Sequence, residues 1–270
     1  MNTLEKQMVK TLADLRTFHH VLGVKAEFEA EGTRLEEAMR LKEVVTKAGL
    51  DLTIKIGGCE AVKDMYDAKV IGVNTIVAPM IESPYAMKKY VQCTKMVFHD
   101  YQDIKFLFNL ETETGYKNLD TMLASKEMKD IDGIVLGRVD MTGSLGMSRE
   151  DINNEEIFKI CRDVAQKTLA HKKELVIGGG VSAQSLPFFA KLPEGALNRF
   201  ETRKIIFDAQ AMLKDKNAEK GILKAVGFEL MWLKNKRDFY GTIHLEDAKR
   251  IDMLEARYKK LIEEAGGHIQ

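Results

Sequence analysis

The sequence predicts an α/β fold in which parallel strands close into a (β/α)8 barrel, the TIM barrel. Apolar runs of strand length alternate with stretches of helical periodicity through most of the 270 residues. The connections are short, which indicates parallel strands joined by crossover helices. Seven or eight such units in about 200 residues favour a closed barrel over an open doubly wound sheet, which is the alternative.

Seven strands are expected, and the eighth is left open. The expected strands cover residues 21–30, 52–58, 73–81, 104–111, 133–140, 174–180 and 198–205. The helices between them are expected over residues 33–49, 60–72, 83–95, 116–130 and 155–172. In the first of these helices Thr33 is suited to the N-cap and Gly49 to the C-terminal end. An eighth strand would come from an irregular segment, or the N-terminal helix would take its place.

Two further segments flank the predicted barrel, which covers residues 21–212. An N-terminal helix is expected over residues 1–20, and a C-terminal helical extension over residues 213–270. The extension is highly charged and contains the only tryptophan, Trp232. Two interpretations stay open: a helix that covers one end of the barrel, or an arm that packs on a neighbouring subunit.

The composition narrows the class of protein and the expected partners. Basic and acidic residues number 41 each, so no net charge favours nucleic acid or an anionic membrane. Three dispersed cysteines exclude a disulfide framework and fit a reducing cytosol. No apolar run reaches the ~18–20 residues that span a bilayer, and no signal core opens the chain. We expect a cytoplasmic protein that binds a small molecule and neither nucleic acid nor a membrane.

Acidic side chains are unusually frequent where the predicted strands end, on the face of a barrel that carries active sites. They are Glu27, Glu29, Glu31, Glu82, Glu111, Glu113, Asp140 and Glu201. Converging carboxylates repel one another unless a cation or protons intervene. Glu111 and Asp140 end neighbouring apolar strands, and two carboxylates completed by waters and substrate oxygens suit Mg²⁺ or Mn²⁺. The alternative is that both are helix N-caps.

Three segments carry a resemblance to a known family: "VAPMIESPYAM", "FNLETETGYKNLD" and "IDGIVLGRVDMTGSLGM". They are similar to the HpcH/HpaI aldolase and citrate lyase family. The resemblance implies a (β/α)8 barrel, a homo-oligomer, and a divalent metal, Mg²⁺ or Mn²⁺, held by Glu111 and Asp140. It implies reversible cleavage of a carbon–carbon bond in a 2-oxo acid such as pyruvate, or in a related acyl substrate, through a metal-stabilised enolate. Asn109 would orient the substrate or a metal-bound water.

The chain departs from this family at three positions. Lys55 stands where the family has an arginine that grips the substrate carboxylate, so the charge is kept and the bidentate fork is lost. Lys55 is also the residue for a Schiff base, if the lysine is desolvated. The family's histidine base has no counterpart, and Glu27 or Glu29 is the candidate base. Arg138 replaces a proline and would hold an anionic group of the substrate, or form a salt bridge with a nearby glutamate.

A glycine-rich turn after the sixth predicted strand is a further candidate for substrate binding. Gly178, Gly179 and Gly180 precede small hydroxyl residues, a pattern that exposes backbone N–H groups to a phosphate or carboxylate, although tight turn geometry alone also explains it.

The expected function is therefore a metal-dependent carbon–carbon lyase of the class II aldolase type. Two alternatives stay open. One is a mutase or isomerase of a phosphorylated substrate held at the glycine-rich turn. The other is a catalytically idle barrel that serves as a binding or assembly subunit, which the missing histidine and the altered arginine would explain.

Overall fold

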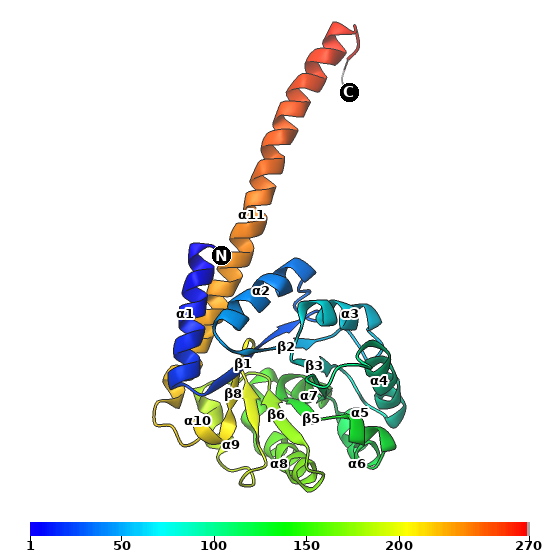
Figure 1. Cartoon of the computed structure of the whole chain (residues 1–270), viewed down its shortest axis with the longest axis vertical. Helices are drawn as coiled ribbons and strands as arrows, with labels where there is room; N and C mark the ends of the chain where they lie inside the picture. The colour runs from blue at the N-terminus through cyan, green and yellow to red at the C-terminus, as the bar shows by residue number, and fades with distance from the viewer. Residues whose placement is uncertain (269–270) are drawn as a thin grey trace. The chain divides into compact units, whose positions relative to one another are not determined.

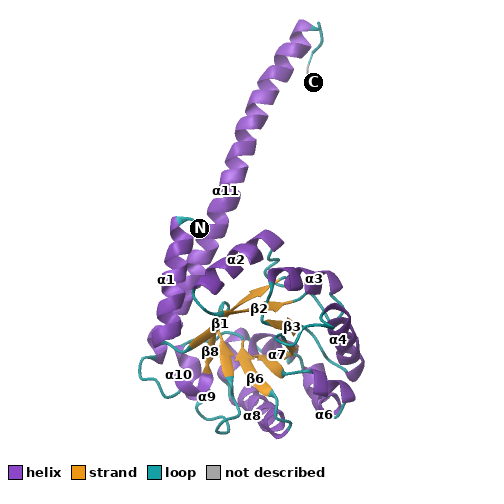
Figure 2. Cartoon of the chain, viewed as in Figure 1, coloured by secondary structure: helices purple, strands orange, loops and turns teal. Residues whose placement is uncertain are grey.

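The structure is a computed structural model that describes residues 1–268, and it confirms the closed barrel. Within these residues eight strands pair in chain order, from β1 round to β8 and back to β1. Figure 1 shows helices around the ring of strands, and Figure 2 separates the two by colour. The strands are β1 Val21–Glu27, β2 Asp51–Lys55, β3 Thr75–Ala78, β4 Lys105–Leu110, β5 Gly133–Gly137, β6 Glu174–Gly178, β7 Arg199–Glu201 and β8 Ile205–Asp208.

The helices alternate with the strands as far as β6, and most of the longer ones lie where apolar residues repeat at helical spacing. The α-helices are α1 Thr3–Phe18, α2 Leu35–Lys47, α3 Val62–Ile71, α4 Pro84–Val97, α5 Glu113–Lys117, α6 Leu119–Leu123, α7 Arg138–Ser144, α8 Glu155–Ala170, α9 Leu186–Phe189, α10 Ala209–Met212 and α11 Ala218–Glu264. The 3-10 helices are η1 Lys126–Asp130, η2 Arg149–Asn153 and η3 Ala183–Ser185.

The eighth strand runs against the direction of the other seven. Strands β1 to β7 pair in parallel, whereas β8 is antiparallel to both β7 and β1. The prediction of one strand over residues 198–205 is wrong, because a turn at residues 202–204 splits it into a hairpin. The Thr202 N–H donates to the Ile205 carbonyl, and the Ile205 N–H donates to Thr202 Oγ1. The hairpin turn therefore lies at the carboxyl end of the parallel strands.

Most of the predicted strands end earlier than expected, and at β5 this changes the setting of a candidate residue. The apolar run over residues 133–140 gives a strand only as far as Gly137, which is the N-cap of α7. Asp140 therefore lies in the first turn of a helix and not on a strand.

The barrel interior changes from apolar to polar toward the carboxyl ends of the strands. Val77, Leu107, Val135 and Val176 come from four neighbouring strands and form one buried cluster. Because side chains alternate between the two faces of a strand, the residue two positions after each of these shares its face. Asn109, two residues after Leu107, is therefore the first polar group above this apolar layer.

The described chain divides into two compact units. The first, Met1–Glu229, holds α1, the barrel and the start of α11, and the second begins at Leu230. The predicted N-terminal helix is confirmed by α1, and the predicted C-terminal helix by α11. No helix among residues 1–268 is both long and apolar enough to span a bilayer.

We expect Gly133→Ala to destabilise the barrel. A Cβ atom at Gly133 would lie 2.6 Å from the Glu174 carbonyl oxygen on the neighbouring strand, so the backbone of β5 or β6 must shift. The free energy of unfolding in urea should fall by about 1–3 kcal/mol. The matched control is Gly143→Ala in α7, where nothing lies within 4 Å of the added atom, and where stability should stay equal or rise. Equal losses in the two variants would contradict the packing argument.

Candidate active site at the barrel mouth

Glu111, the residue directly after β4, is buried and is bound by three donors. Its Oε2 accepts from Asn109 Nδ2 and lies 3.5 Å from Lys55 Nζ, and its Oε1 accepts from the Met80 N–H at 3.3 Å. The N-cap of the next helix is Thr112, so Glu111 is not a capping residue. A carboxylate has about four acceptor positions, so Glu111 keeps room for a further partner.

Met80 reaches Glu111 through an unusual backbone conformation. Its φ is +51°, in the left-handed region that non-glycine residues rarely adopt, and its side chain is exposed. This conformation directs the Met80 N–H to Glu111, and strain of this kind typically gathers at functional sites.

Asn109 presents a buried oxygen that has no partner among the described residues. Its Nδ2 donates to Glu111, which leaves Oδ1 without a hydrogen bond although it is inaccessible to solvent. An unsatisfied buried acceptor costs roughly 1–3 kcal/mol and is rare in native proteins. A cation or a hydrogen-bond donor placed at this oxygen would remove that cost.

The helix that carries Asp140 begins next to Glu111. A Cβ atom added to Gly137 would lie 3.0 Å from Glu111 Oε2, so the absent side chain leaves room for that carboxylate. The Glu113 N–H donates to Ser144 Oγ at the end of the same helix, at 2.8 Å. Asp140, between Gly137 and Ser144, is exposed, and within residues 1–268 its carboxylate has no hydrogen bond or ion pair.

These groups fit a hard divalent cation that keeps several waters. Within the described residues no group of three or more His, Cys, Asp or Glu side chains could hold a metal. A site here would therefore combine the carboxylates of Glu111 and Asp140 with the Asn109 amide oxygen, and leave other positions to water and substrate. That donor set of oxygens alone is what Mg²⁺ and Mn²⁺ prefer.

Lys55, at the end of β2, lies between Glu29, in the loop after β1, and Glu111. Its Nζ lies 3.0 Å from Glu29 Oε2 and 3.5 Å from Glu111 Oε2. Burial lowers the pKa of Lys55, but Glu111 and Glu29 outweigh it, and the pKa is raised above the ordinary lysine value. The lysine is therefore an ammonium at neutral pH. Glu29 is the more exposed of its two partners.

A second charged group in the barrel interior was not singled out from the sequence. Lys25 Nζ lies between Glu201 at 2.5 Å and Glu27 at 3.0 Å. Burial lowers the pKa of Lys25, yet the two carboxylates raise it well above the ordinary value. Burial raises the pKa of Glu27, but Lys25 outweighs it and the pKa is lowered. The signal was present: Lys25 and Glu27 alternate along β1 and so share its inner face.

Arg138 has no anionic partner, although an anion or a salt bridge was expected. The side chain is fully buried at 0% exposure, and it donates to the carbonyls of Gly178 and Gly179 and to the Asn153 side chain. Burial lowers its pKa to about 10. The guanidinium therefore links α7 to the turn after β6. Its role in substrate binding stays a prediction, and to bind a substrate anion it would have to give up some of these hydrogen bonds.

The glycine-rich turn is explained by close packing. Gly179 has φ of +80°, and a Cβ there would lie 2.6 Å from the Val139 backbone nitrogen. Gly180 has φ of +62°, and its Cβ would lie 2.5 Å from Ile152. The carbonyls of Gly178 and Gly179 are bound by Arg138. A phosphate at this turn stays a prediction, whereas the tight geometry of the turn is observed.

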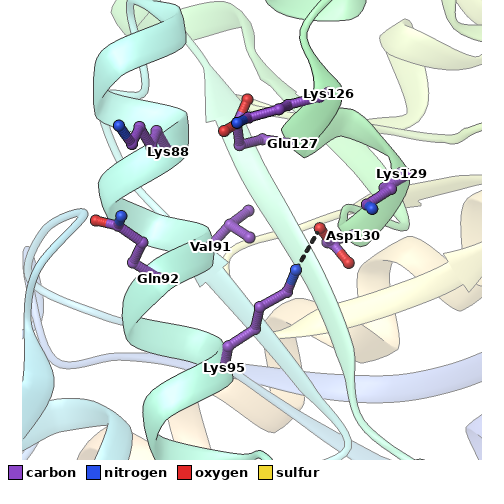
Figure 3. Close-up of a pocket in the computed structure, with 8 residues that line it drawn as sticks. All are labelled: Lys88, Val91, Gln92, Lys95, Lys126, Glu127, Lys129 and Asp130. Atoms are coloured by element: carbon purple, nitrogen blue, oxygen red, sulfur yellow. Dashed lines mark hydrogen bonds and ion pairs between the residues drawn. The ribbon is translucent and has the colours of Figure 1, made fainter.

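A separate groove lies outside the barrel, between α4 and η1. Its volume is 290 Å³, and Figure 3 shows lysines on both sides with one ion pair, Lys95 to Asp130 at 2.7 Å. None of the predicted site residues lines it. The lining residues are Lys88, Val91, Gln92, Lys95, Lys126, Glu127, Lys129 and Asp130.

Comparison with known proteins agrees with the fold and shows the family. Residues 34–178, more than half of the chain, match the profile of the family described as HpcH/HpaI aldolase/citrate lyase. A HpcH/HpaI aldolase/citrate lyase family protein from Burkholderia cenocepacia J2315 has a TM-score of 0.58 and 14% identity, over 72% of this chain and 82% of that chain. A HpcH/HpaI aldolase from Desulfitobacterium hafniense DCB-2 has a TM-score of 0.58 and 13% identity, over 72% and 81%. At such identities these likenesses show the barrel fold. No curated protein gives a significant match.

We expect Glu27→Gln to destabilise the protein in a pH-dependent way. At neutral pH the variant loses one of the two charged partners of Lys25, and the free energy of unfolding should fall by about 1–3 kcal/mol. Because the pKa of Glu27 is lowered by folding, its contribution is present above the ordinary value of 4.5 and is lost as the pH falls below it.

The difference between wild type and Glu27→Gln, measured by urea unfolding, should therefore shrink from pH 6 toward roughly pH 3. The control is Glu194→Gln, an exposed position, which should change neither stability nor its pH dependence. A difference that stays constant across this range would exclude the ion pair as its cause.

Proposed function

The chain belongs to the HpcH/HpaI aldolase/citrate lyase family, and from this premise we propose that it is a metal-dependent carbon–carbon lyase of the class II aldolase type. Membership supports activity of the lyase or aldolase type on a small molecule. The proposal adds the metal, Mg²⁺ or Mn²⁺, and the substrate class, a 2-oxo acid of the pyruvate type or a related acyl compound.

One observation carries the proposal: the buried Asn109 oxygen without a partner, next to the Glu111 carboxylate. Lys55 compensates part of the negative charge of the carboxylates around Glu111. The carboxylates of Glu29 and Glu111 outnumber that one ammonium, and the carboxylate of Asp140 would add a further negative charge at the proposed site. A divalent cation would balance this charge and would give the Asn109 oxygen its partner.

Glu111 and Asp140 would hold the cation, with Asn109 as a neutral oxygen ligand or as the group that orients the substrate. A divalent cation at this position supplies charge stabilisation to the enolate oxygen that develops when the carbon–carbon bond breaks. The Met80 N–H and the Asn109 amide hold Glu111 in place, which fixes the direction of its carboxylate.

Lys55 would bind the carboxylate of the 2-oxo acid. An ammonium has three donors, and within the described residues two of the contacts of Lys55 are to Glu29 and Glu111. The third donor and the positive charge serve the substrate. A single ammonium grips less rigidly than the bidentate arginine of the family, so we expect tolerance for variation in the carboxylate end.

Glu29 is a better candidate for the base than Glu27. The Glu27 carboxylate is held by Lys25, and its lowered pKa makes it a weak acceptor. Glu29 is in the loop after β1, is one-third exposed, and contacts Lys55. It would take the proton from the substrate hydroxyl as the carbon–carbon bond breaks, and it would return the proton to the carbon of the resulting enolate.

We expect a divalent cation with pyruvate to stabilise the protein only when both metal-binding carboxylates are present. Mn²⁺ and pyruvate at saturation should raise the melting temperature by roughly 5 °C, through ligand linkage. Glu111→Gln and Asp140→Asn should abolish this shift and lower kcat by about a thousandfold. The control is Glu113→Gln. Glu113 lies two positions after Glu111, and its side chain forms an ion pair with Lys117.

Three results would contradict the metal site. They are a shift that survives both substitutions, activity that persists in EDTA, and a wild-type protein that responds to no combination of cation and 2-oxo acid. The last of these would favour the catalytically idle barrel.

We expect no Schiff base at Lys55. Because the pKa of Lys55 is raised, the neutral amine that attacks a carbonyl is scarce at neutral pH. Incubation with pyruvate and borohydride should leave the intact mass unchanged. Lys55→Met should raise KM for the 2-oxo acid by about tenfold or more, and Lys55→Arg should restore it, because the carboxylate needs a cation at this position. A stable adduct that disappears in Lys55→Met would overturn this assignment.

A further inference from the structure

The part of α11 that begins at Leu230 exposes a series of large apolar side chains. Nine of them are each more than half exposed, and three of the nine are Phe239, Leu245 and Met253. The other six have a regular spacing and are Leu230, Leu233, Ile251, Leu254, Tyr258 and Leu261. Exposed apolar surface of this extent is uncommon on a monomer and marks a contact with another molecule. A long helix in water also draws most of its stability from packing of an apolar face.

The exposed residues have the spacing of a coiled coil. Steps of three and four residues alternate without a break over positions 230, 233, 237, 240, 244, 247, 251, 254, 258 and 261. This is the a and d repeat of a heptad. The same spacing continues toward the N-terminus in Leu223 and Val226, which are exposed as well. We call these ten positions from Leu230 onward the seam.

The seam is apolar at both ends and polar in the middle. The polar positions are Arg237, His244 and Asp247, and Tyr240 lies among them. A buried arginine and a buried aspartate are costly in a coiled coil unless each meets an opposite charge. Arg237 pairs with its exposed neighbour Asp238, at 2.7 Å, which lies outside the seam. Within the seam of one helix Arg237 and Asp247 are ten residues and thus about 15 Å apart, which is too far for a pair.

We propose that the seam binds the seam of a second copy of this chain, in antiparallel orientation. One register matches every layer of the central part. Leu230 then packs on Leu254 of the second copy, Leu233 on Ile251, Tyr240 on His244, and Arg237 meets Asp247. Each contact occurs twice, because the arrangement is two-fold symmetric.

The charges select the second copy and its direction. In a parallel pair in register, Arg237 would face Arg237 and Asp247 would face Asp247, and like charges in a seam are strongly unfavourable. The antiparallel register turns both repulsions into attractions. A partner of another sequence would need the same layers in reverse order, which a second copy supplies by symmetry.

Gly241 supports the position of the two-fold axis. In this register the two-fold axis lies at the level of residue 242, and Gly241 is the residue before it. A glycine in the middle of a helix costs about 0.5–1 kcal/mol relative to alanine, and nothing lies within 4 Å of a Cβ added there. Its use is explained where two backbones approach each other. Phe228 and Trp232 are buried and lie on another face of the same helix, so the proposed pairing does not involve them.

The first test is the association of the full chain, measured by sedimentation velocity over a wide range of concentration. The wild type should form dimers. Arg237→Asp or Asp247→Arg alone places two like-charge layers in the seam and should weaken the dimer by about a hundredfold. The double variant Arg237→Asp with Asp247→Arg should restore it. The matched control is Lys249→Asp, with the same change of charge on an exposed position outside the seam.

A monomer at every concentration would overturn the proposal, and so would an oligomer that Arg237→Asp leaves unchanged. Circular dichroism on each variant should show the wild-type helix content, since all three substituted positions are exposed. This assembly does not depend on the proposed reaction, and its failure would leave the lyase assignment standing.

The second test is the direction of the helices, measured by disulfide crosslinking in a Cys59→Ser background, where the other cysteines are buried. A mixture of Leu233→Cys and Ile251→Cys chains should give a crosslinked pair, because these positions face each other in the antiparallel register. Leu254→Cys alone should give none. Efficient crosslinking of Leu254→Cys with itself would show a parallel pair and would reject the register.

Discussion

Three carboxylates, those of Glu27, Glu111 and Glu201, are buried in the barrel interior, where burial removes most of their solvation. A buried charge persists only with an opposite charge or several hydrogen bonds. The barrel meets this condition with two lysines: Lys25 between Glu27 and Glu201, and Lys55 beside Glu111. The surrounding backbone follows from this requirement. A Cβ atom added to Gly137 would lie 3.0 Å from Glu111 Oε2, and one added to Gly178 would lie 3.1 Å from Glu201 Oε1, so a side chain at either position would crowd a carboxylate.

The same requirement explains how Arg138 packs against the glycine-rich turn. Once β5 and β6 end in glycine to leave room for carboxylates, their turns have little side-chain packing of their own. Arg138 fills that place: it bonds to two turn carbonyls and packs on the rings of Phe188 and Phe189. Its guanidinium thus stabilises the wall of the site, and a role toward the substrate stays a prediction.

The sequence predicts the barrel well, because the order of strands and helices depends on local patterns. The apolar runs give the strand order, and the position after β4 gives Glu111. The hairpin of β7 and β8 was missed because its turn contains no glycine or proline, and Thr202 closes it with its own side chain. The Lys25 group was missed because strand ends were weighed and inward alternation along β1 was not. The partners of Arg138 depend on contacts 15 to 47 residues away, which no local pattern contains.

In the barrel and in the long helix alike, a charge that is buried needs an opposite charge, but the source of that charge differs. In the barrel, residues distant in sequence meet, so that Lys25 reaches Glu201 although 176 positions separate them. A single helix cannot fold back in this way, and Arg237 and Asp247 are held about 15 Å apart by its rise per residue. Arg237 pairs with the exposed Asp238 beside it, so within the seam itself an opposite charge for Arg237 and Asp247 comes from a second chain. The antiparallel second copy provides it at both positions at once, and the chain needs no other sequence to do so.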